Sequence, residues 1–342
     1  MKTLVLERPG TPDTLKLKEH PVPSPGLDDV RVKVMAVGLN PVDYKTAEWG
    51  WQTWRWPHIL GLDIAGTIQT VGSEVTSWKP GDRVFYHGDL SKPGGYAEFA
   101  VAPAHILAVI PAEVSFESAA AIPCAGFTAW QILSRKIPVK PNQTLLVHGG
   151  AGGVGGFAVQ MGRNLGLNVL TTCSAANFSA VKKLGADYTI DYTSEYVSAR
   201  VNEITNGRGV DIVINTIDSD SATQDLKRVA FGGHLACVAG FPDFSKIEPF
   251  TRAISIHESA LGGAHLSGDR TAQVDLARMG KELIELVREE KLSPMLTEVI
   301  SLEEIPQALI RLSQRHVRGK IVARPDLKYK SRNIELMKTN RS

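Results

Sequence analysis

Cysteine is scarce in this chain. The three cysteines, Cys124, Cys173 and Cys237, stand far apart in apolar surroundings. No CxxC pair and no HExxH segment occurs, so the sequence indicates neither a disulfide framework nor a simple zinc-binding module. Isolated thiols of this kind are typical of small buried side chains in a reducing compartment, and we expect a cytoplasmic protein.

Long apolar runs are also missing. The longest uncharged stretch, residues 141–162, contains seven glycines, which is unlike a membrane-spanning helix. Residues 7–9, Glu-Arg-Pro, interrupt the apolar residues that follow Lys2, which argues against an N-terminal signal peptide. We therefore expect no membrane association.

Charge of one sign is not in excess. The 342 residues include 38 Lys and Arg against 36 Asp and Glu, a formal net charge of +2. Such a balance argues against a protein that binds nucleic acid or a charged membrane surface. The excess is local, because residues 326–342 contain five basic and two acidic side chains. We interpret that segment as a basic tail.

The N-terminal third has a β-rich pattern. Short β-prone runs separated by proline and glycine occur at residues 3–6, 30–37, 64–71, 83–86 and 97–101. Many short strands with such punctuation are typical of an antiparallel, barrel-like module.

The pattern changes near Ser115, where we expect a helix to begin. Predicted strands at 144–148, 168–173, 188–190, 211–215 and 234–239 alternate with helices that include 126–134, 153–165 and 178–184. Such alternation predicts an α/β fold with a doubly wound parallel sheet. Helices at 271–290 and 303–315 and a strand at 319–323 follow.

The strongest local motif is the run Thr-Leu-Leu-Val-His-Gly-Gly-Ala-Gly-Gly-Val-Gly-Gly at residues 144–156. It places a GxGxxG pattern directly after an apolar strand and before a helix, the context of a dinucleotide-binding loop. Glycines allow a diphosphate to approach the backbone N–H groups at the helix N-terminus. We expect cofactor contacts at Gly150, Gly152, Gly153, Val154 and Gly155. His148 precedes the loop and is interpreted as a packed residue with a satisfied hydrogen bond.

The next strand bears on which dinucleotide binds. A carboxylate at its end would favour NAD, but residues 171–177 contain no acid. Ser174 and Asn177 can donate hydrogen bonds to a 2′-phosphate, so NADPH is favoured and NADH stays possible. Carboxyl ends of parallel strands face the cofactor in such a sheet. The ends of the predicted strands 211–215 and 234–239 therefore predict nicotinamide contacts at Thr216, Ile217, Gly240 and Phe241.

Several further motifs carry a family resemblance. They are Gly38-Leu-Asn-Pro-Val-Asp-Tyr-Lys45, Gly61-Leu-Asp-Ile-Ala-Gly66, Lys79-Pro-Gly-Asp-Arg-Val84, Gly94-Gly-Tyr-Ala-Glu98 and Gly319-Lys-Ile-Val322. With the glycine loop, their order and spacing over residues 1–325 resemble the zinc-independent quinone oxidoreductase branch of the medium-chain dehydrogenase/reductase superfamily.

The resemblance implies a domain organisation. A GroES-like β-barrel catalytic domain would comprise residues 1–122 and 266–325, and a Rossmann domain residues 123–265, with the active site in the cleft between them. It places Thr128 near the nicotinamide ribose phosphate and Tyr192 beside the adenosine 2′-phosphate. A basic residue that many relatives have in this loop is Asn177 here.

The match of these motifs to the superfamily also argues against a catalytic metal. Zinc-dependent alcohol dehydrogenases have a Cys, a His-Glu pair and a second Cys or Asp where this chain has Asn40, Leu62-Asp63 and Ala125. One carboxylate and one amide do not make a three-ligand zinc set. We predict chemistry without a metal.

Without a Lewis acid, hydride transfer is easiest to a conjugated acceptor whose oxygen is held by hydrogen bonds. Asn40, Tyr44, Lys45 and Asp63 are the candidate catalytic residues. Asp43 is interpreted mainly as a helix-capping acid. The family resemblance also implies that His87 lies near the cleft. It would be either a structural residue of a loop or a residue that contacts the substrate. Four tryptophans, at positions 49, 51, 54 and 56, could line an aromatic pocket or simply pack.

The resulting hypothesis is an NADPH-dependent, zinc-independent reductase of quinones or α,β-unsaturated carbonyls. A non-catalytic NADPH-binding sensor or structural protein and a zinc-dependent alcohol dehydrogenase are the alternatives. Because relatives pair edge strands, the apolar run at residues 254–266 predicts a homodimer.

Overall fold

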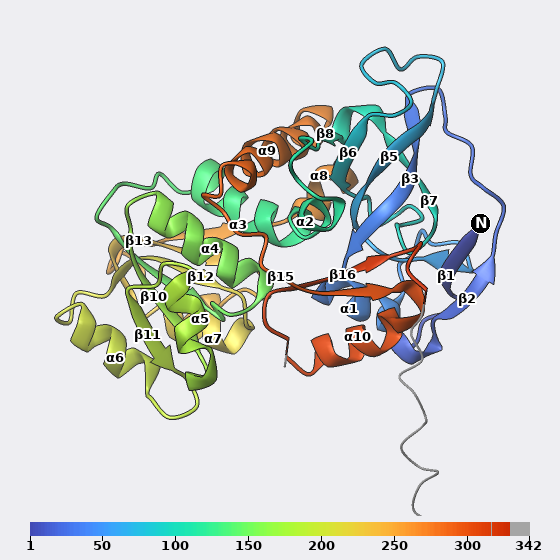
Figure 1. Ribbon diagram of the computed structural model, residues 1–342. Helices are drawn as coiled ribbons and strands as arrows, with labels where there is room; N and C mark the ends of the chain where they lie inside the picture. Colours follow the sequence, from blue (N-terminus) through green and yellow to red (C-terminus); the bar gives the residue numbers. More distant parts are fainter. Residues whose placement is uncertain (316, 329–342) are drawn as a thin grey trace, which may run out of the picture.

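The computed structural model of the chain describes residues 1–315 and 317–328. Figure 1 shows two lobes, a β-rich lobe that contains both ends of the described chain and a second lobe built from its middle. None of the helices in the described part is long and apolar enough to cross a membrane. All but the first three residues of the predicted basic tail lie outside the described residues.

The β-rich lobe contains a seven-stranded sheet in the order β15-β16-β3-β5-β6-β8, with β7 paired to β3. Its strands are β3 (Asp29–Gly38), β5 (Asp63–Val71), β6 (Arg83–His87), β7 (Phe99–Pro103), β8 (Ala108–Val109), β15 (Leu296–Ser301) and β16 (Lys320–Arg324). A smaller sheet has the order β2-β1-β4, with β1 (Lys2–Leu6), β2 (Lys16–Glu19) and β4 (His58–Ile59). The strand predicted at 97–101 begins only at Phe99, because Ala97 forms an isolated bridge with Thr3.

The C-terminal return adds a parallel pair to this lobe. β15 and β16 run parallel because α10 (Ile305–Ser313) connects them as a crossover helix. The helix predicted at 303–315 begins later, after a turn in which Glu304 accepts a hydrogen bond from the N–H of Ser301 at 2.8 Å. The antiparallel pattern of the N-terminal third did not predict this parallel pair.

The middle lobe contains a six-stranded sheet in the order β11-β10-β9-β12-β13-β14. Every strand pair in it is parallel. Its strands are β9 (Thr144–His148), β10 (Asn168–Cys173), β11 (Tyr188–Asp191), β12 (Val210–Asn215), β13 (Val229–Cys237) and β14 (Ser255–Glu258). This order is that of a doubly wound, dinucleotide-binding sheet, so the predicted fold class is confirmed.

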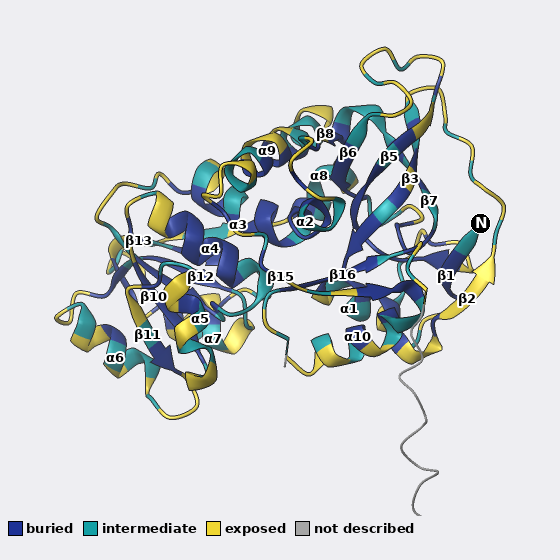
Figure 2. Cartoon of the chain, viewed as in Figure 1, coloured by how far each residue is buried: buried dark blue, intermediate teal, exposed yellow. Residues whose placement is uncertain are grey.

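Both faces of this sheet are buried. Val147 and Val169 belong to the same core as Phe157 of α4 (Gly153–Asn164). Their neighbours Leu146 and Leu170 point to the opposite face, into a core that also contains residues of the helices there. Figure 2 shows buried strands between helices whose outer surfaces are exposed. The other helices of the lobe are α5 (Phe178–Lys183), α6 (Val197–Ile204) and α7 (Ser219–Asp225).

One hydrophobic core joins the two lobes. It contains Phe85 of β6, Phe157 of α4 and Leu283 of α9 (Arg270–Arg288). The helix predicted at 126–134 lies beside it as α3 (Thr128–Trp130) between two π-helical turns. The short helices α2 (Phe116–Ala120) and α8 (Leu261–Leu266) complete this region. The two lobes are therefore packed against each other through this core.

Candidate active site

The glycine loop connects β9 to α4. A Cβ on Gly150 would come 2.0 Å from Oγ1 of Thr171, and one on Gly155 would come 2.2 Å from the carbonyl oxygen of Gly149. These two glycines are therefore required by packing. Gly152 differs, because a Cβ there would meet only the Gly149 carbonyl oxygen, at 3.4 Å. Gly152 is the N-cap of α4, so open space lies before the helix N-terminus, as an anion site requires.

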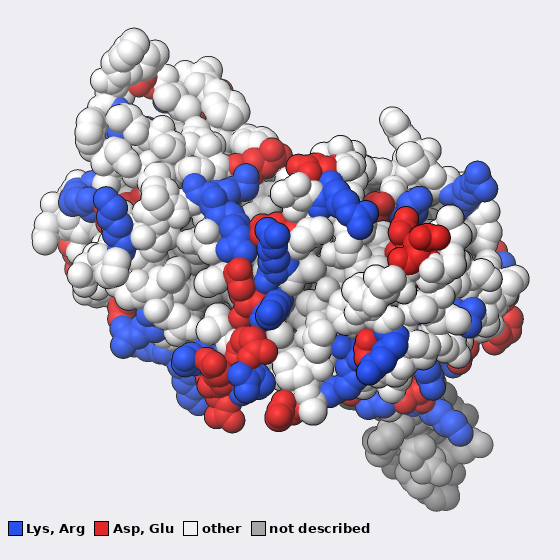
Figure 3. All heavy atoms as spheres, turned by 90° about the horizontal axis from the view of Figure 1, so that it is seen from above, with Lys and Arg blue, Asp and Glu red and all other residues white. Residues whose placement is uncertain are grey.

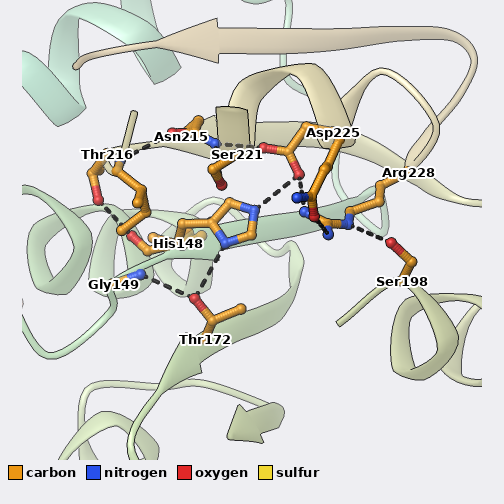
Figure 4. Close-up of polar contacts among 12 residues, drawn as sticks. His148, Gly149, Thr172, Ser198, Asn215, Thr216, Ser221, Asp225 and Arg228 are labelled. Carbon is orange, nitrogen blue, oxygen red and sulfur yellow. Dashed lines mark hydrogen bonds and ion pairs between the residues drawn. The ribbon is translucent and has the colours of Figure 1, made fainter. Parts of the chain in front are cut away.

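The end of β9 is anchored to β10 by His148. Its Nδ1 lies 3.2 Å from Oγ1 of Thr172, and the same oxygen accepts a hydrogen bond from the N–H of Gly149 at 3.2 Å. Figure 4 shows this chain of contacts at the base of the loop. The predicted packed role of His148 is confirmed.

On its other side His148 contacts a buried acid. Its Nε2 lies 2.9 Å from Oδ1 of Asp225, which also accepts from Arg228 at 2.7 Å, while Asn215 donates to Oδ2 at 2.7 Å. Burial alone would raise the pKa of Asp225, but His148, Arg228 and Asn215 hold it below its ordinary value. The network in Figure 4 thus connects the glycine loop to β12 and to α7 and the turn that follows it.

Of the four residues predicted to face the cofactor from strand ends, two lie near the glycine loop. The Thr216 hydroxyl donates to the carbonyl oxygen of His148 at 2.8 Å, and a Cβ on Gly149 would lie 3.6 Å from Ile217. Gly240 is packed against Ser219, where a Cβ would come 2.5 Å from Oγ. Phe241 is exposed. Thr216 and Ile217 are therefore the two that the fold brings against the loop.

The adenosine-side candidates lie at the ends of β10 and β11. Asn177 donates a hydrogen bond to Ser174 at 3.1 Å, and Tyr192 is exposed. Asp191 ends β11 in this region, but its Oδ1 accepts hydrogen bonds from the N–H and hydroxyl of Thr193. Asn177 also lines a surface groove whose other wall comes from the β-rich lobe, with Thr297, Glu298, Arg311, Gln314, Val317 and Arg318.

A buried polar cluster lies where the lobes meet. Asn40 donates to Oδ2 of Asp63 at 2.8 Å, and the ammonium of Lys320 donates to Oδ1 of Asn40 at 2.5 Å. Lys320 and Asp63 are 3.5 Å apart, and the N–H of Cys124 donates to the second oxygen of Asp63 at 2.8 Å. Two of the predicted catalytic residues, Asn40 and Asp63, are therefore in direct contact. Their partner Lys320 was not predicted, although it stands in the Gly319-Lys-Ile-Val motif.

Lys320 also reaches the glycine loop. Its Cδ would lie 3.3 Å from a Cβ on Gly153, the first residue of α4. The same ammonium donates to the carbonyl oxygen of Leu39 at 3.1 Å. One buried cation therefore connects the helix that would hold a diphosphate with the polar cluster of the β-rich lobe.

The other candidates of this motif lie on α1 (Pro41–Trp49), a helix that the sequence patterns did not predict. Asp43 accepts a hydrogen bond from the N–H of Asn40 at 2.7 Å, which caps the helix, and burial raises the pKa of Asp43 to about 7. Tyr44 packs on the core of the β-rich lobe, and burial raises its pKa. No hydrogen bond joins Tyr44 or Lys45 to the polar cluster within the described residues. The capping pattern Asn-Pro-x-Asp is the signal that could have located α1.

The tryptophan cluster is split between core and surface. Trp54 is buried, stacks on His58 with ring centroids 4.0 Å apart, and donates from its indole N–H to the carbonyl oxygen of Leu90 at 2.6 Å. Trp49 and Trp56 are exposed. Trp54 therefore packs, whereas the two exposed indoles are available to a ligand.

Three side chains near the polar cluster resemble a metal ligand set. One ligand atom each from Asp63, His87 and Cys124 lies within 4.8 Å of the other two. A cation does not fit them well, because the Lys320 ammonium lies 3.5 Å from Asp63 and both carboxylate oxygens already accept hydrogen bonds. Burial also raises the pKa of the Cys124 thiol well above its ordinary value, so the thiolate that zinc binds is disfavoured.

The charged surface carries no extended patch of one sign on the face drawn in Figure 3. Lys and Arg lie beside Asp and Glu across the middle of that face. Such mixing is unlike the basic stripe that a nucleic-acid-binding face presents.

Comparison with known families assigns both parts of the chain. Residues 26–112 match the family described as Alcohol dehydrogenase GroES-like domain, and residues 184–322 match the family described as Zinc-binding dehydrogenase. The second description implies zinc, which the Asp63, His87 and Cys124 side chains do not suit.

Individual proteins extend this similarity over the whole chain. Quinone-oxidoreductase QR1, chloroplastic, of Triphysaria versicolor is 31% identical over 322 residues, which cover 91% of this chain and 94% of that protein. The crystal structure of a quinone oxidoreductase from Pseudomonas syringae is 30% identical with a TM-score of 0.85, covering 95% of this chain and 99% of the other. A structure titled NAD-dependent alcohol dehydrogenase is 29% identical with a TM-score of 0.81, covering 95% and 99%.

Proposed function

Because the chain belongs to the zinc-independent quinone oxidoreductase branch of the medium-chain dehydrogenase/reductase superfamily, we propose that it reduces quinones or α,β-unsaturated carbonyls with a nicotinamide cofactor. The observation that carries this proposal is the Asn40–Asp63–Lys320 cluster beside the glycine loop. Asn40 and Asp63 stand at positions where, by the family resemblance, zinc-dependent dehydrogenases have metal ligands, and Asp63 is paired there with Lys320, 3.5 Å away. The acceptor must then be one that accepts hydride without a Lewis acid.

The chain's own residues supply binding and orientation. Open space before Gly152 leaves room for a diphosphate at the N-terminus of α4, where backbone N–H groups and the helix dipole favour negative charge. The aliphatic part of Lys320 packs beside the same helix start, while its ammonium is paired with Asp63. When bound, a reduced nicotinamide supplies the hydride. A conjugated acceptor spreads the resulting negative charge onto its oxygen, which hydrogen-bond donors then hold.

The proposed function is tested by cofactor consumption with a small panel of quinones, enals and enones. We expect NADPH oxidation with at least one conjugated acceptor and no loss of rate after chelation. Tight NADPH binding without turnover of any acceptor would favour the non-catalytic alternative. Alcohol oxidation that chelators abolish, together with stoichiometric zinc, would favour an alcohol dehydrogenase.

We also propose that the protein prefers NADPH to NADH. Ser174, Asn177 and Tyr192 are proposed to face the 2′-phosphate, and Arg318 lies across the groove from Asn177. Arg311 lines the same groove but is engaged with Glu298 through contacts of 2.9 and 2.8 Å. Arg318 therefore takes the place of the basic residue that many relatives have at the Asn177 position.

Replacing Arg318 with glutamine is expected to lower kcat/KM for NADPH about 10-fold and to leave kcat/KM for NADH nearly unchanged. The reason is that a charge-assisted hydrogen bond to phosphate contributes about 1.5–3 kcal/mol. Arg311→Gln is the matched control and should have a smaller effect, because its guanidinium is already paired. Steady-state kinetics with both cofactors measures the difference. Equal losses with NADPH and NADH would contradict the assignment.

We further propose that the protein is a homodimer. β14 is an edge strand that pairs only with β13 within the described residues, and Phe231 and Phe250 are strongly exposed. Unpaired edges of this kind are templates for strand addition by a second chain. Light scattering at micromolar concentration should give twice the chain mass of 37.1 kDa. A mass of one chain would reject the dimer.

A further inference from the structure

His87 has an unsatisfied polar atom in the middle of the site. Its side chain is 3% exposed, and no hydrogen-bond partner for Nδ1 is found within residues 1–315 and 317–328. A buried polar atom without a partner costs about 1–3 kcal/mol, so it calls for an explanation. One of its ring nitrogens lies within 4.8 Å of a carboxylate oxygen of Asp63 and of the Cys124 sulfur. The unsatisfied imidazole therefore stands at the polar cluster.

The position of the ring is determined by two neighbouring elements. His87 ends β6 and pairs in register with Asp63 of β5, which places the two residues side by side across the strands. On the other side His265 of α8 stacks on the ring with centroids 5.8 Å apart, and its Nε2 lies 3.2 Å from the His87 carbonyl oxygen. The imidazole is thus held in one place without a hydrogen bond to Nδ1.

The other polar groups of the cluster are already satisfied. Lys320 donates to two acceptors, and Asn40 uses both ends of its amide. Within the described residues the Tyr86 hydroxyl also lacks a partner, whereas the Tyr96 hydroxyl faces Asp43 and lowers the pKa of that carboxyl; both tyrosine side chains belong to the core of the β-rich lobe. Tyr86 precedes His87 on β6 and so points to the opposite face of the sheet. Among these groups, His87 is the one with capacity left for a ligand.

The charge of the ring suits a donor to an oxyanion. Burial, assisted by the neighbouring His265, lowers the pKa of His87 to about 3, so the imidazole is neutral at physiological pH. A neutral imidazole offers one N–H donor and keeps its proton when it binds a developing negative charge.

We propose that His87 is a catalytic residue that donates a hydrogen bond from Nδ1 to the carbonyl oxygen of the conjugated acceptor. This assignment rests on the proposed function. The acceptor takes hydride from the reduced nicotinamide at its conjugated carbon, its π electrons move onto the carbonyl oxygen, and His87 holds the resulting oxyanion. Water then supplies the proton that completes the reduced product.

The test compares two variants of His87. His87→Leu removes the donor, and we expect kcat for an enone to fall about 100-fold, the usual effect of removing one oxyanion donor, while the Kd of NADPH changes less than about twofold. His87→Asn keeps an N–H near the position of Nδ1 and should recover at least about a tenth of the parent rate. His105→Leu is the matched control, because His105 makes no contact with the cluster among the described hydrogen bonds and pairs instead with Gln273 at 2.6 Å.

A second readout does not depend on turnover. With oxidised cofactor bound, addition of the enone should shift the ring C–H resonances of one histidine in a ¹H–¹³C spectrum, and His87→Asn identifies that histidine. A kcat within threefold of the parent in His87→Leu would overturn the proposal, as would an unshifted His87 resonance under saturating enone. If His87→Leu fails to fold, the asparagine variant and the resonance decide. An inactive parent whose His87 resonance still shifts would reject the reductase function but not the binding role.

Discussion

Replacing Gly152 with valine is expected to weaken dinucleotide binding about 100-fold while the protein stays folded. A Cβ at this position meets only the Gly149 carbonyl oxygen at 3.4 Å, which is an ordinary contact. The backbone of Gly152 is extended, with φ −83° and ψ −177°, so a β-branched residue fits its conformation. The added methyl groups would instead occupy the space before α4 that a diphosphate needs. A 100-fold loss corresponds to about 2.7 kcal/mol.

The measurement is a fluorescence titration with NADPH beside a thermal unfolding scan. Gly155→Ala is the comparison variant for stability, because its Cβ would come 2.2 Å from the carbonyl oxygen of Gly149. That variant should lose stability as well as binding. A Gly152→Val protein that binds NADPH within threefold of the parent would mean that the diphosphate does not lie at this helix end, and the proposed function would lose its basis.

Replacing Lys320 with methionine is expected to lower the free energy of unfolding by about 3–5 kcal/mol, the usual cost of leaving one member of a buried ion pair alone. Lys320 is 3% exposed and Asp63 is fully buried, so water cannot replace the lost ammonium. Burial already raises the pKa of Asp63 against the opposing effect of Lys320. Without Lys320 that pKa should rise further.

The sign of the pH dependence follows from that shift. A carboxyl whose pKa is higher in the folded than in the unfolded protein stabilises the fold at low pH, and this contribution is lost as pH rises through the folded pKa. The stability deficit of Lys320→Met should therefore be smaller at pH 5 than at pH 8.

Urea unfolding of Lys320→Met at both pH values measures this effect. The double variant Lys320→Met with Asp63→Asn removes both charges and should regain most of the lost stability. If the single variant does not fold, recovery of folding in the double variant still tests the ion pair. A single variant within about 1 kcal/mol of the parent at pH 8 would show that the pair contributes little.

The glycine loop could be predicted because its determinants are contiguous. An apolar strand, a GxGxxG run and a helix follow one another within residues 144–165, and each requirement is local to that segment. The start of helix α1 is also determined by neighbouring residues. Its Asn-Pro-x-Asp start carries a local capping signal, although the apolar periodicity of these residues does not indicate a helix.

Contacts across the fold could not be predicted in this way. Asn40 and Lys320 are 280 positions apart and meet because β16 pairs with β3 at the lobe boundary. His87 faces Asp63 only because β6 and β5 pair in one particular register. A shift of one residue would turn His87 to the other side of the sheet, and no local pattern specifies that register.

The amino-acid sequence by itself determined the class of this protein: two kinds of strand pattern, a dinucleotide loop, and the lack of a zinc ligand set. These follow from periodicity, glycine placement and residue type, which are properties of neighbouring positions. Only the tertiary structure decided which polar groups satisfy one another and which one is left unsatisfied. The pairing of these polar groups depends on strand register and on the packing of the two lobes through one core. In that core, residues distant in sequence together keep water away from the polar groups.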